Sequence, residues 1–265
     1  MIEPYEINKI YAGECADMMS KLPSECIDLT CTSPPYDNLR DYNGFTFDYK
    51  PVLQQLYRVT KPGGVVVWVV ADATIKGSET GTSFRQALYA MECGFNCETM
   101  IYQQAGTGAK GSNYYYWQSF EYMFVFAKGQ PKTSNRLKDK PNSQHGKKNG
   151  QENKVSRMGT RTERGVRVTP KFSARTNVWR YQVGNNGDDK TNHQAPFPES
   201  LARDHILSWS NPGDLVLDPF MGSGTTAKMA YQNGRNYLGF DISAEYVELA
   251  KKRVAWANPP LIVVS

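Results

Sequence analysis

Short apolar runs that end in turns constrain the fold of this chain most strongly. Val65–Val70 is almost entirely β-branched, and Leu215–Asp218 is apolar up to its last residue. Ile27–Thr32 shows a similar buried-strand pattern. Runs without alternation between apolar and polar residues are typical of strands covered on both faces, as in a parallel sheet between helices.

Helical patterns alternate with these runs along most of the chain. Strands are also predicted at Ile7–Tyr11, Asn96–Gln103, Glu121–Lys128 and Tyr237–Phe240. Helices are predicted at Ala16–Lys21, Pro51–Val59, Ser83–Glu92, Glu199–Ser208, Thr225–Gln232 and Ala244–Trp256. Such alternation predicts an α/β fold with a doubly wound, mostly parallel sheet.

Length and composition narrow the class of protein. The 265 residues suit one large α/β domain or a smaller one with an insertion. The apolar runs fall short of the ~20 residues of a membrane span. The N-terminus has no basic start followed by an apolar stretch, so we expect a cytoplasmic protein without membrane contact. Five cysteines and three scattered histidines predict neither a disulfide framework nor a metal site.

The charge is distributed unevenly along the chain. Between Lys128 and Lys190 there are 16 Lys or Arg against 5 Asp or Glu, whereas the remaining residues carry an acidic excess. Residues 129–192 also have few aliphatic side chains and no clear periodicity, which indicates an inserted module. A basic block of this kind favours a polyanion such as nucleic acid as partner, and a solvated loop is the alternative.

The turn after Leu215–Asp218 is the first candidate ligand site. It reads Asp-Pro-Phe-Met-Gly-Ser-Gly-Thr-Thr and lies between a strand and a helix, where α/β sheets bind ligands. It lacks the Lys of a phosphate loop, since Thr225 stands there, and the third Gly of a dinucleotide fingerprint, since Ala227 stands there. Asp241 ends the next strand, where a carboxylate accepts hydrogen bonds from ribose. A nucleoside without phosphates fits both features, and a purely structural turn is the alternative.

A second candidate site follows the strand Ile27–Thr32. Ser33-Pro34-Pro35-Tyr36 places two prolines, which lack N–H donors, at a strand end. The Ser33 hydroxyl and the Ser33 or Pro34 carbonyl can hold the hydrogens of an exocyclic amine and favour a pyramidal nitrogen. Tyr36 offers a flat face for stacking on a base. A plain Pro-Pro turn is the alternative.

Together the two motifs resemble the DNA amino-methyltransferases in their circularly permuted β-class order. There the catalytic motif comes early, the cofactor motif comes late, and a target-recognition insert lies between them. The resemblance extends over nearly the whole chain and includes Val59–Gly64, Glu121–Phe126, His193–Pro198 and Ser210–Asp214. It implies a Rossmann-like methyltransferase fold, S-adenosylmethionine as cofactor with S-adenosylhomocysteine as product, no metal, and double-stranded DNA as substrate.

The resemblance also implies the division of the chain and the role of each motif residue. Residues 1–128 form the catalytic half, 129–192 the target-recognition insert and 193–265 the cofactor-binding half. Ser33, Pro34, Pro35 and Tyr36 would hold a base flipped out of the duplex. The cofactor would be bound by Glu14, Cys15, Asp218, Pro219, Phe220, Gly222, Ser223, Gly224, Thr225, Asp241, His193 and Pro196. Glu14 stands where relatives often have Asp, and it is one methylene longer.

Ser in the first motif position resembles the members that methylate N4 of cytosine, whereas Asp is more typical of N6-adenine members. Methylation at C5 of cytosine needs a thiolate nucleophile, in that family within a Pro-Cys dipeptide, and none of the five cysteines follows Pro. We therefore predict an N4-cytosine DNA methyltransferase that acts by direct in-line transfer. N6-adenine methylation and a catalytically silent DNA-binding protein are the alternatives. The sequence leaves open a homodimer and a restriction endonuclease acting on the same site.

Overall fold

The computed structural model of the chain describes residues 2–35, 47–105, 115–116, 118–149, 154–155, 161–162, 167–182 and 198–257. It divides into two units. The larger unit comprises Met1–Asn135 and Asn177–Ser265, and the smaller one comprises Arg136–Thr176. None of the helices in the described ranges has the length and apolar character needed to cross a bilayer.

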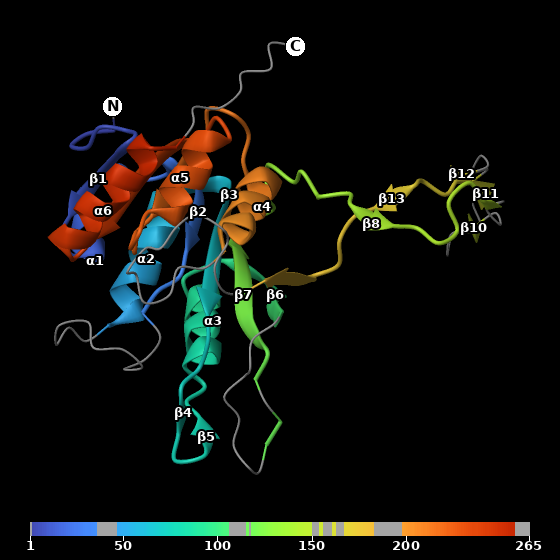
Figure 1. Cartoon of the computed structure of the whole chain (residues 1–265), viewed down its shortest axis with the longest axis horizontal. Coiled ribbons are helices and arrows are strands. Elements are labelled where there is room, and N and C mark those ends of the chain that lie inside the picture. The colour runs from blue at the N-terminus through green and yellow to red at the C-terminus, as the bar shows by residue number, and fades with distance from the viewer. Residues whose placement is uncertain are drawn as a thin grey trace. The chain divides into compact units, whose positions relative to one another are not determined.

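The larger unit is built on an eight-stranded sheet in the order β1-β16-β15-β2-β3-β7-β6-β14. Figure 1 labels β1, β2, β3, β7 and β6 of this sheet. Neighbouring strands are parallel, except that β7 runs antiparallel to β3 and β6. This arrangement confirms the predicted mostly parallel sheet. The strands are β1 (Lys9–Ala12), β2 (Ile27–Thr32), β3 (Thr60–Val70), β6 (Asn96–Ala105), β7 (Phe120–Ala127), β14 (Val178–Gln182), β15 (Leu215–Asp218) and β16 (Asn236–Asp241), with a short hairpin of β4 (Thr74–Ile75) and β5 (Ser78–Glu79).

Helices cover both faces of the sheet. On one face α1 (Cys15–Ser20), α2 (Tyr49–Val59) and α3 (Thr82–Glu92) pack side by side. On the other face α4 (Glu199–Trp209), α5 (Thr225–Gln232) and α6 (Ala244–Ala255) do the same, drawn in orange to red in Figure 1. Alternate residues of a strand face the two helix layers. Leu217 and Trp68, for example, belong to the core under α1–α3, and burial of such large apolar side chains is the main source of stability.

The sheet has a topological switch point between β15 and β2. These neighbours are hydrogen-bonded in parallel through Val216–Leu29 and Leu217–Thr30. The chain leaves β15 into α5 on one face, whereas the helix that follows β2 in the described chain is α2 on the other face. Connections that diverge in this way mark the place, at the carboxyl ends of the strands, where α/β sheets bind ligands.

Two parts of the sheet differ from the sequence-based prediction. β3 begins at Thr60 rather than Val65, because a register irregularity opposite Ile27–Leu29 absorbs Lys61–Gly64; proline and glycine are tolerated in strands at such irregularities. β14 lies within the predicted insert, yet it pairs in parallel with β6. The separate unit is therefore Arg136–Thr176, narrower than the predicted 129–192.

The smaller unit, here called the basic ribbon (residues 136–176), consists of short antiparallel ladders. β8 (Lys140–Pro141) pairs with β13 (Phe172–Ser173), β9 (Lys148–Asn149) with β12 (Arg167–Val168), and β10 (Lys154–Val155) with β11 (Arg161–Thr162). The ladders are nested in sequence, so the unit is a two-stranded ribbon.

Candidate active site

The candidate site lies at the carboxyl ends of four neighbouring strands. β1 runs into Gly13 and Glu14, β16 ends at Asp241, β15 ends at Asp218, and β2 runs into Ser33. The parallel register pairs Ala12 with Asp241, so these ends lie along one edge of the sheet. Both motifs singled out in the sequence therefore meet at the switch point.

A hydrogen bond between side chains joins the two motifs. Thr32 Oγ1 donates to Asp218 Oδ1 at 2.6 Å, and both residues are buried. The backbone N–H of Phe220 donates to the same carboxylate oxygen at 3.0 Å. Thr226 in α5 donates its hydroxyl to the carbonyl of Cys31 at 3.0 Å, which ties the start of α5 to β2 as well.

Asp218 is a buried carboxylate. Burial raises its pKa to about 6, although hydrogen bonds from Thr32 and the Phe220 N–H favour the ionised form. Desolvation therefore outweighs hydrogen bonding in setting the pKa of this group. Asp218 holds the loop to β2 from the inside of the protein.

The turn between β15 and α5 uses most of its N–H groups internally. Phe220 N donates to Asp218, and Met221 N donates to the Phe240 carbonyl at 2.8 Å. Gly222 N donates to Asp241 Oδ2 at 2.7 Å, and Gly224 N donates to the Met221 carbonyl at 2.9 Å. A phosphate loop instead presents its N–H groups to the ligand. The geometry therefore agrees with a ligand that carries no phosphate at this turn.

Asp241 is half-buried at the end of β16. Its Oδ2 accepts from Gly222 N, and its Oδ1 accepts from Ser243 N at 2.9 Å. Burial raises its pKa, and the two N–H bonds act in the opposite direction. A carboxylate has about four acceptor positions, so both oxygens keep capacity for a pair of hydroxyl groups.

The glycine-rich turn is held from behind by α6. Arg253 in α6 is buried and donates to Ser223 Oγ at 2.9 Å and to Thr225 Oγ1 at 3.0 Å. Glu199, the first residue of α4, accepts from both Arg253 and Lys228. The side chains of Ser223 and Thr225, both predicted to bind cofactor, are thus buried in contacts within the protein.

Gly224 is required by close packing as well as by backbone conformation. Its φ of +85° favours glycine, and a Cβ atom there would lie 2.8 Å from the Ala250 Cβ. The partly exposed residues of the turn are Phe220 and Gly222, whereas Pro219 is buried. The Phe220 ring meets Phe47 edge-on at 5.3 Å between centroids.

The motif Ser33-Pro34-Pro35-Tyr36, here called the acceptor motif, begins where β2 ends. Ser33 and Pro35 are partly exposed and Pro34 is buried. Cys31, two residues earlier, is fully buried, and burial raises the pKa of its thiol far above the ordinary value. A thiol kept protonated in this way is a poor nucleophile, which agrees with the exclusion of C5 methylation from the sequence.

The other predicted site residues fall into two groups. Glu14 caps α1, with its carboxylate accepting from Ala16 N at 3.0 Å and Asp17 N at 2.7 Å. Cys15 is buried beside it. Tyr36, His193 and Pro196 lie outside the described residues.

No role was predicted from the sequence for Thr32, Arg253 or Asp72. Thr32 directly precedes the acceptor motif, and its position at the end of a predicted strand is the sequence feature that could have identified it. Arg253 lies in a basic last turn of α6 that is typical of solvent-exposed helix ends. Asp72, just beyond β3, is buried and accepts from Ser83 N at 2.9 Å, which fixes the start of α3.

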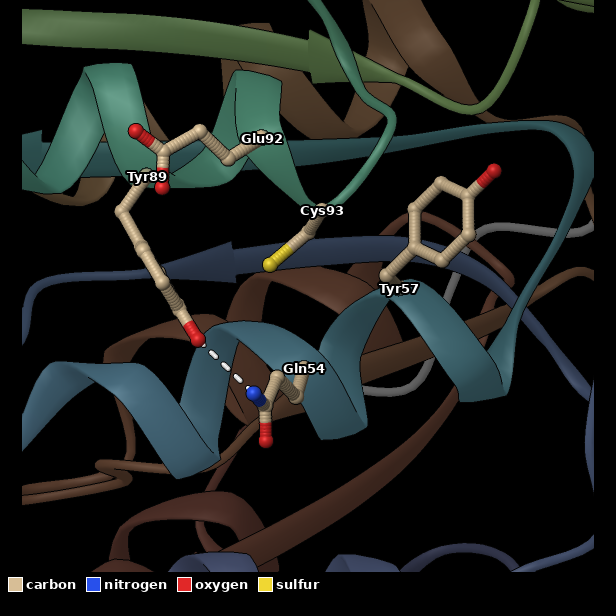
Figure 2. Close-up of a pocket in the computed structure, with 5 residues that line it drawn as sticks. All are labelled: Gln54, Tyr57, Tyr89, Glu92 and Cys93. Carbon is tan, nitrogen blue, oxygen red and sulfur yellow. Dashed lines mark hydrogen bonds between the residues drawn. The ribbon is translucent and has the colours of Figure 1, made fainter.

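A surface pocket elsewhere in the larger unit does not belong to this site. It has a volume of about 240 Å³ and is lined by Gln54, Tyr57, Tyr89, Glu92 and Cys93, with a hydrogen bond of 2.7 Å from Gln54 to the Tyr89 hydroxyl (Figure 2). These residues lie toward the carboxyl ends of α2 and α3, whereas ligand sites of α/β sheets lie at the carboxyl ends of strands. The volume is also below that of typical ligand pockets.

Comparisons with known proteins point to one family. The family model for DNA methylase, the N6/N4 methylase family, matches residues 27–252. The orphan methyltransferase M.BamHII of Bacillus amyloliquefaciens is 54% identical over 236 residues, covering 86% of this chain and 88% of the relative.

Two solved structures share the fold. The PvuII DNA methyltransferase, described as cytosine-N4-specific, superposes with a TM-score of 0.66 at 19% identity, covering 92% of this chain and 85% of that one. A DNA modification methylase of Thermus thermophilus, solved in complex with S-adenosyl-L-methionine, has a TM-score of 0.62 at 23% identity, covering 93% and 94%.

The pKa of Asp218 predicts how the Asp218→Asn variant differs from the wild type. A carboxyl group whose folded pKa of about 6 exceeds the ordinary 3.8 stabilises the fold in its protonated state. That contribution is complete below about pH 4 and is lost as the pH rises through about 6. Relative to Asp218→Asn, which does not titrate, the wild-type free energy of unfolding should fall by up to about 3 kcal/mol over this range.

Urea unfolding at a series of pH values measures this difference. Asp17→Asn, at an exposed carboxylate of α1, is the control and should change stability by less than about 0.5 kcal/mol. A pH-independent difference between the wild type and Asp218→Asn would contradict the assigned pKa.

Proposed function

The chain belongs to the N6/N4 DNA methylase family, and we propose that it transfers a methyl group from S-adenosylmethionine to N4 of cytosine in double-stranded DNA. One observation carries the proposal. The Ser33-Pro34-Pro35 end of β2 and the loop between Asp218 and Asp241 meet at the switch point of the sheet and are joined by the Thr32–Asp218 hydrogen bond.

The residues at the strand ends fit S-adenosylmethionine. Asp241 keeps acceptor capacity for the two ribose hydroxyls, and it lies beside Gly222 in the partly exposed stretch of the turn. Most N–H groups of the turn donate hydrogen bonds to acceptors within the protein, and the cofactor has no phosphate that would need them as donors. The bound cofactor supplies a methyl group on a sulfonium, which is electrophilic without a metal.

Ser33 and Pro34 bind the amine that accepts the methyl group. The lone pair of an exocyclic amine is delocalised into the base, so the nitrogen is a poor nucleophile. Ser33 Oγ and the carbonyl of Ser33 or Pro34 accept the amine hydrogens, which draws the nitrogen toward a pyramidal geometry and localises the lone pair. Proline at 34 and 35 fixes the backbone that presents these acceptors.

Transfer is direct and needs no covalent enzyme intermediate. Bound at Asp241 and Gly222, S-adenosylmethionine would supply the methyl group for the new C–N bond, and S-adenosylhomocysteine would be the leaving product. The amine then releases one proton to solvent. A base within the duplex is out of reach of such a site, so the target base is flipped out, at a cost of a few kcal/mol.

Ser33 favours cytosine over adenine as the target. N4-cytosine members of the family resemble this chain in having Ser at the first motif position, whereas Asp is more typical of N6-adenine members. The similarity in fold to a cytosine-N4-specific enzyme agrees with this choice and does not decide it. A homodimer and a restriction endonuclease of the same specificity remain predictions.

Nucleoside mass spectrometry tests the reaction and the base together. Unmethylated plasmid DNA incubated with the protein and S-adenosylmethionine should yield N4-methylcytosine, because Ser33 and Pro34 hold that amine. The Ser33→Ala variant removes one acceptor and should lower the initial rate about 10- to 100-fold, while cofactor binding stays near the wild-type value.

Two results would overturn the proposal in different ways. N6-methyladenine without methylcytosine would establish the adenine alternative. Absence of any methylated base, together with no binding of S-adenosylmethionine in calorimetry and retained DNA binding, would establish a silent DNA-binding protein.

The cofactor assignment predicts a selective defect in Asp241→Ala. Loss of the carboxylate should weaken binding of S-adenosylmethionine about 10- to 100-fold, because hydrogen bonds to a charged group are lost. DNA affinity should stay within about twofold, since Asp241 contributes to the cofactor side only. Calorimetry and fluorescence anisotropy measure the two affinities. Glu248→Ala, at an exposed carboxylate of α6, is the matched control, and equal loss of both affinities in Asp241→Ala would contradict the assignment.

A further inference from the structure

The helix layer of α1–α3 covers only part of its face of the sheet. Phe126 of β7 is buried in the core beneath this layer. The face continues beyond β7 onto β6 and β14, where Thr99 and Val178 are exposed. The opposite face of β14 is covered, since the buried Trp179 ring stacks on His205 of α4 at 4.6 Å between centroids. Among the described residues, β14 and the middle of β6 therefore have one side that no helix covers.

A row of apolar side chains crosses this side of the sheet from α3 to β14. The rings of Phe84 in α3 and Tyr122 in β7 contact each other, with 5.2 Å between their centroids. Tyr122 is registered opposite Ile101 of β6, and Ile101 is registered opposite Val178 of β14. Residues directly opposite each other on neighbouring strands point to the same face of a sheet. The four side chains therefore form one continuous row.

Helix α3 adds an apolar stripe at the end of this row. Phe84, Leu88 and Met91 are spaced by four and three residues, which places them on one side of the helix. Their exposed fractions are 47%, 60% and 52%, and that of Val178 is 47%. Single exposed apolar residues are common on protein surfaces, whereas a connected apolar surface marks an interaction site. The connected surface, here called the α3 face, consists of Phe84, Leu88, Met91, Tyr122, Ile101 and Val178.

The charged residues beside the α3 face balance one another. Arg85 and Glu92 are both exposed on α3, on either side of Leu88 along the helix. They are seven residues apart, which corresponds to two helical turns, or about 10.5 Å along the axis. Nucleic acids are bound by Lys and Arg residues that neutralise several phosphates. A mostly apolar surface flanked by one charge of each sign does not have that character.

We propose that the α3 face binds a second copy of this chain, with the two α3 helices antiparallel about a two-fold axis close to Leu88. An interface with two-fold symmetry uses the same surface of both subunits and must be complementary to itself. Antiparallel helices centred near Leu88 place Arg85 of each copy opposite Glu92 of the other copy, so two ion pairs of opposite sign form. This inference goes beyond the proposed function and does not depend on it.

The composition of the α3 face agrees with a protein partner. The centre of a homodimer interface is rich in aromatic and aliphatic side chains and Met, and charged residues lie at its rim. Phe84, Leu88 and Met91 have this central character, and Arg85 and Glu92 have the character of the rim. A membrane surface instead selects helices with several Lys or Arg residues on the polar side. The self-complementary pair of charges therefore favours a second copy.

Analytical ultracentrifugation of the full chain tests whether the dimer exists. Without DNA or cofactor, the wild-type protein should reach a mass of twice 29.9 kDa as its concentration rises. Leu88→Glu should raise the dissociation constant of the dimer about 100-fold or more, because it places a charge at the centre of the interface. Glutamate is a good helix former and Leu88 is exposed in one copy, so circular dichroism should show an unchanged fold.

Reversal of the two charges tests the antiparallel arrangement. Arg85→Glu and Glu92→Arg should each raise the dissociation constant about 10-fold or more, because each creates two pairs of like charge across the interface. The double variant restores opposite charges and should return to within about threefold of the wild-type value. Lys251→Glu, at an exposed position of α6 on the other side of the sheet, is the matched control and should leave the dissociation constant unchanged.

Three outcomes would overturn the inference. A wild-type protein that is monomeric at every concentration has no such interface, and Leu88-dependent binding to duplex DNA or to anionic lipid vesicles would then assign the α3 face to that partner. A dimer that Leu88→Glu leaves intact uses another surface. Single reversals that the double variant does not repair would exclude the antiparallel pairing. All these measurements omit methyl transfer, so their failure is distinguishable from failure of the proposed function.

Discussion

The hydrogen bond between Thr32 and Asp218 is the contact on which the rest of the site depends. β2 and β15 run parallel as far as Leu217 and Thr30, and beyond that point their chains leave toward opposite faces of the sheet. At such a divergence α/β sheets bind ligands. Without a link, the two strand ends that flank it, here called the two walls of the site, would be free to shift. The 2.6 Å bond between two buried side chains fixes one wall, which carries Ser33 and Pro34, to the other, which carries the loop beneath Asp241. Burial makes the link costly, since it raises the pKa of Asp218 to about 6.

The remaining contacts extend this link outward. Arg253 fixes the turn from the α6 side, and Glu199 connects Arg253 to α4. The N–H groups of the turn donate to Asp218, Asp241 and the carbonyls of Phe240 and Met221. The turn therefore exposes a carboxylate and a glycine backbone rather than N–H groups that would bind an anion. Rigid walls of this kind keep a methyl donor and an amine in line, and such positioning is a large part of what an enzyme contributes to a transfer between two bound groups.

Much of the fold could be predicted from the sequence because its patterns are local. β2, β15 and α5 have the predicted boundaries, since their apolar runs end in strong turn residues. β14 was not predicted because its partner β6 is distant in sequence and only Trp179 and Tyr181 stand out within a basic stretch. In the site, the positions of Ser33 and Asp241 followed from strand ends. The buried contacts of Ser223 and Thr225 could not be predicted, because both side chains bind Arg253, which lies 28 to 30 residues further along the chain.

A double-mutant cycle across the Thr32–Asp218 bond tests the central claim most directly. The rate constant of methyl transfer from tritium-labelled S-adenosylmethionine to DNA would be measured at saturating cofactor for Thr32→Val, Asp218→Asn and the double variant. If the bond couples the two walls, each single change lowers the rate constant about 10-fold and the double variant is no slower than the slower single variant. A double variant whose loss equals the product of the two single losses would contradict the account.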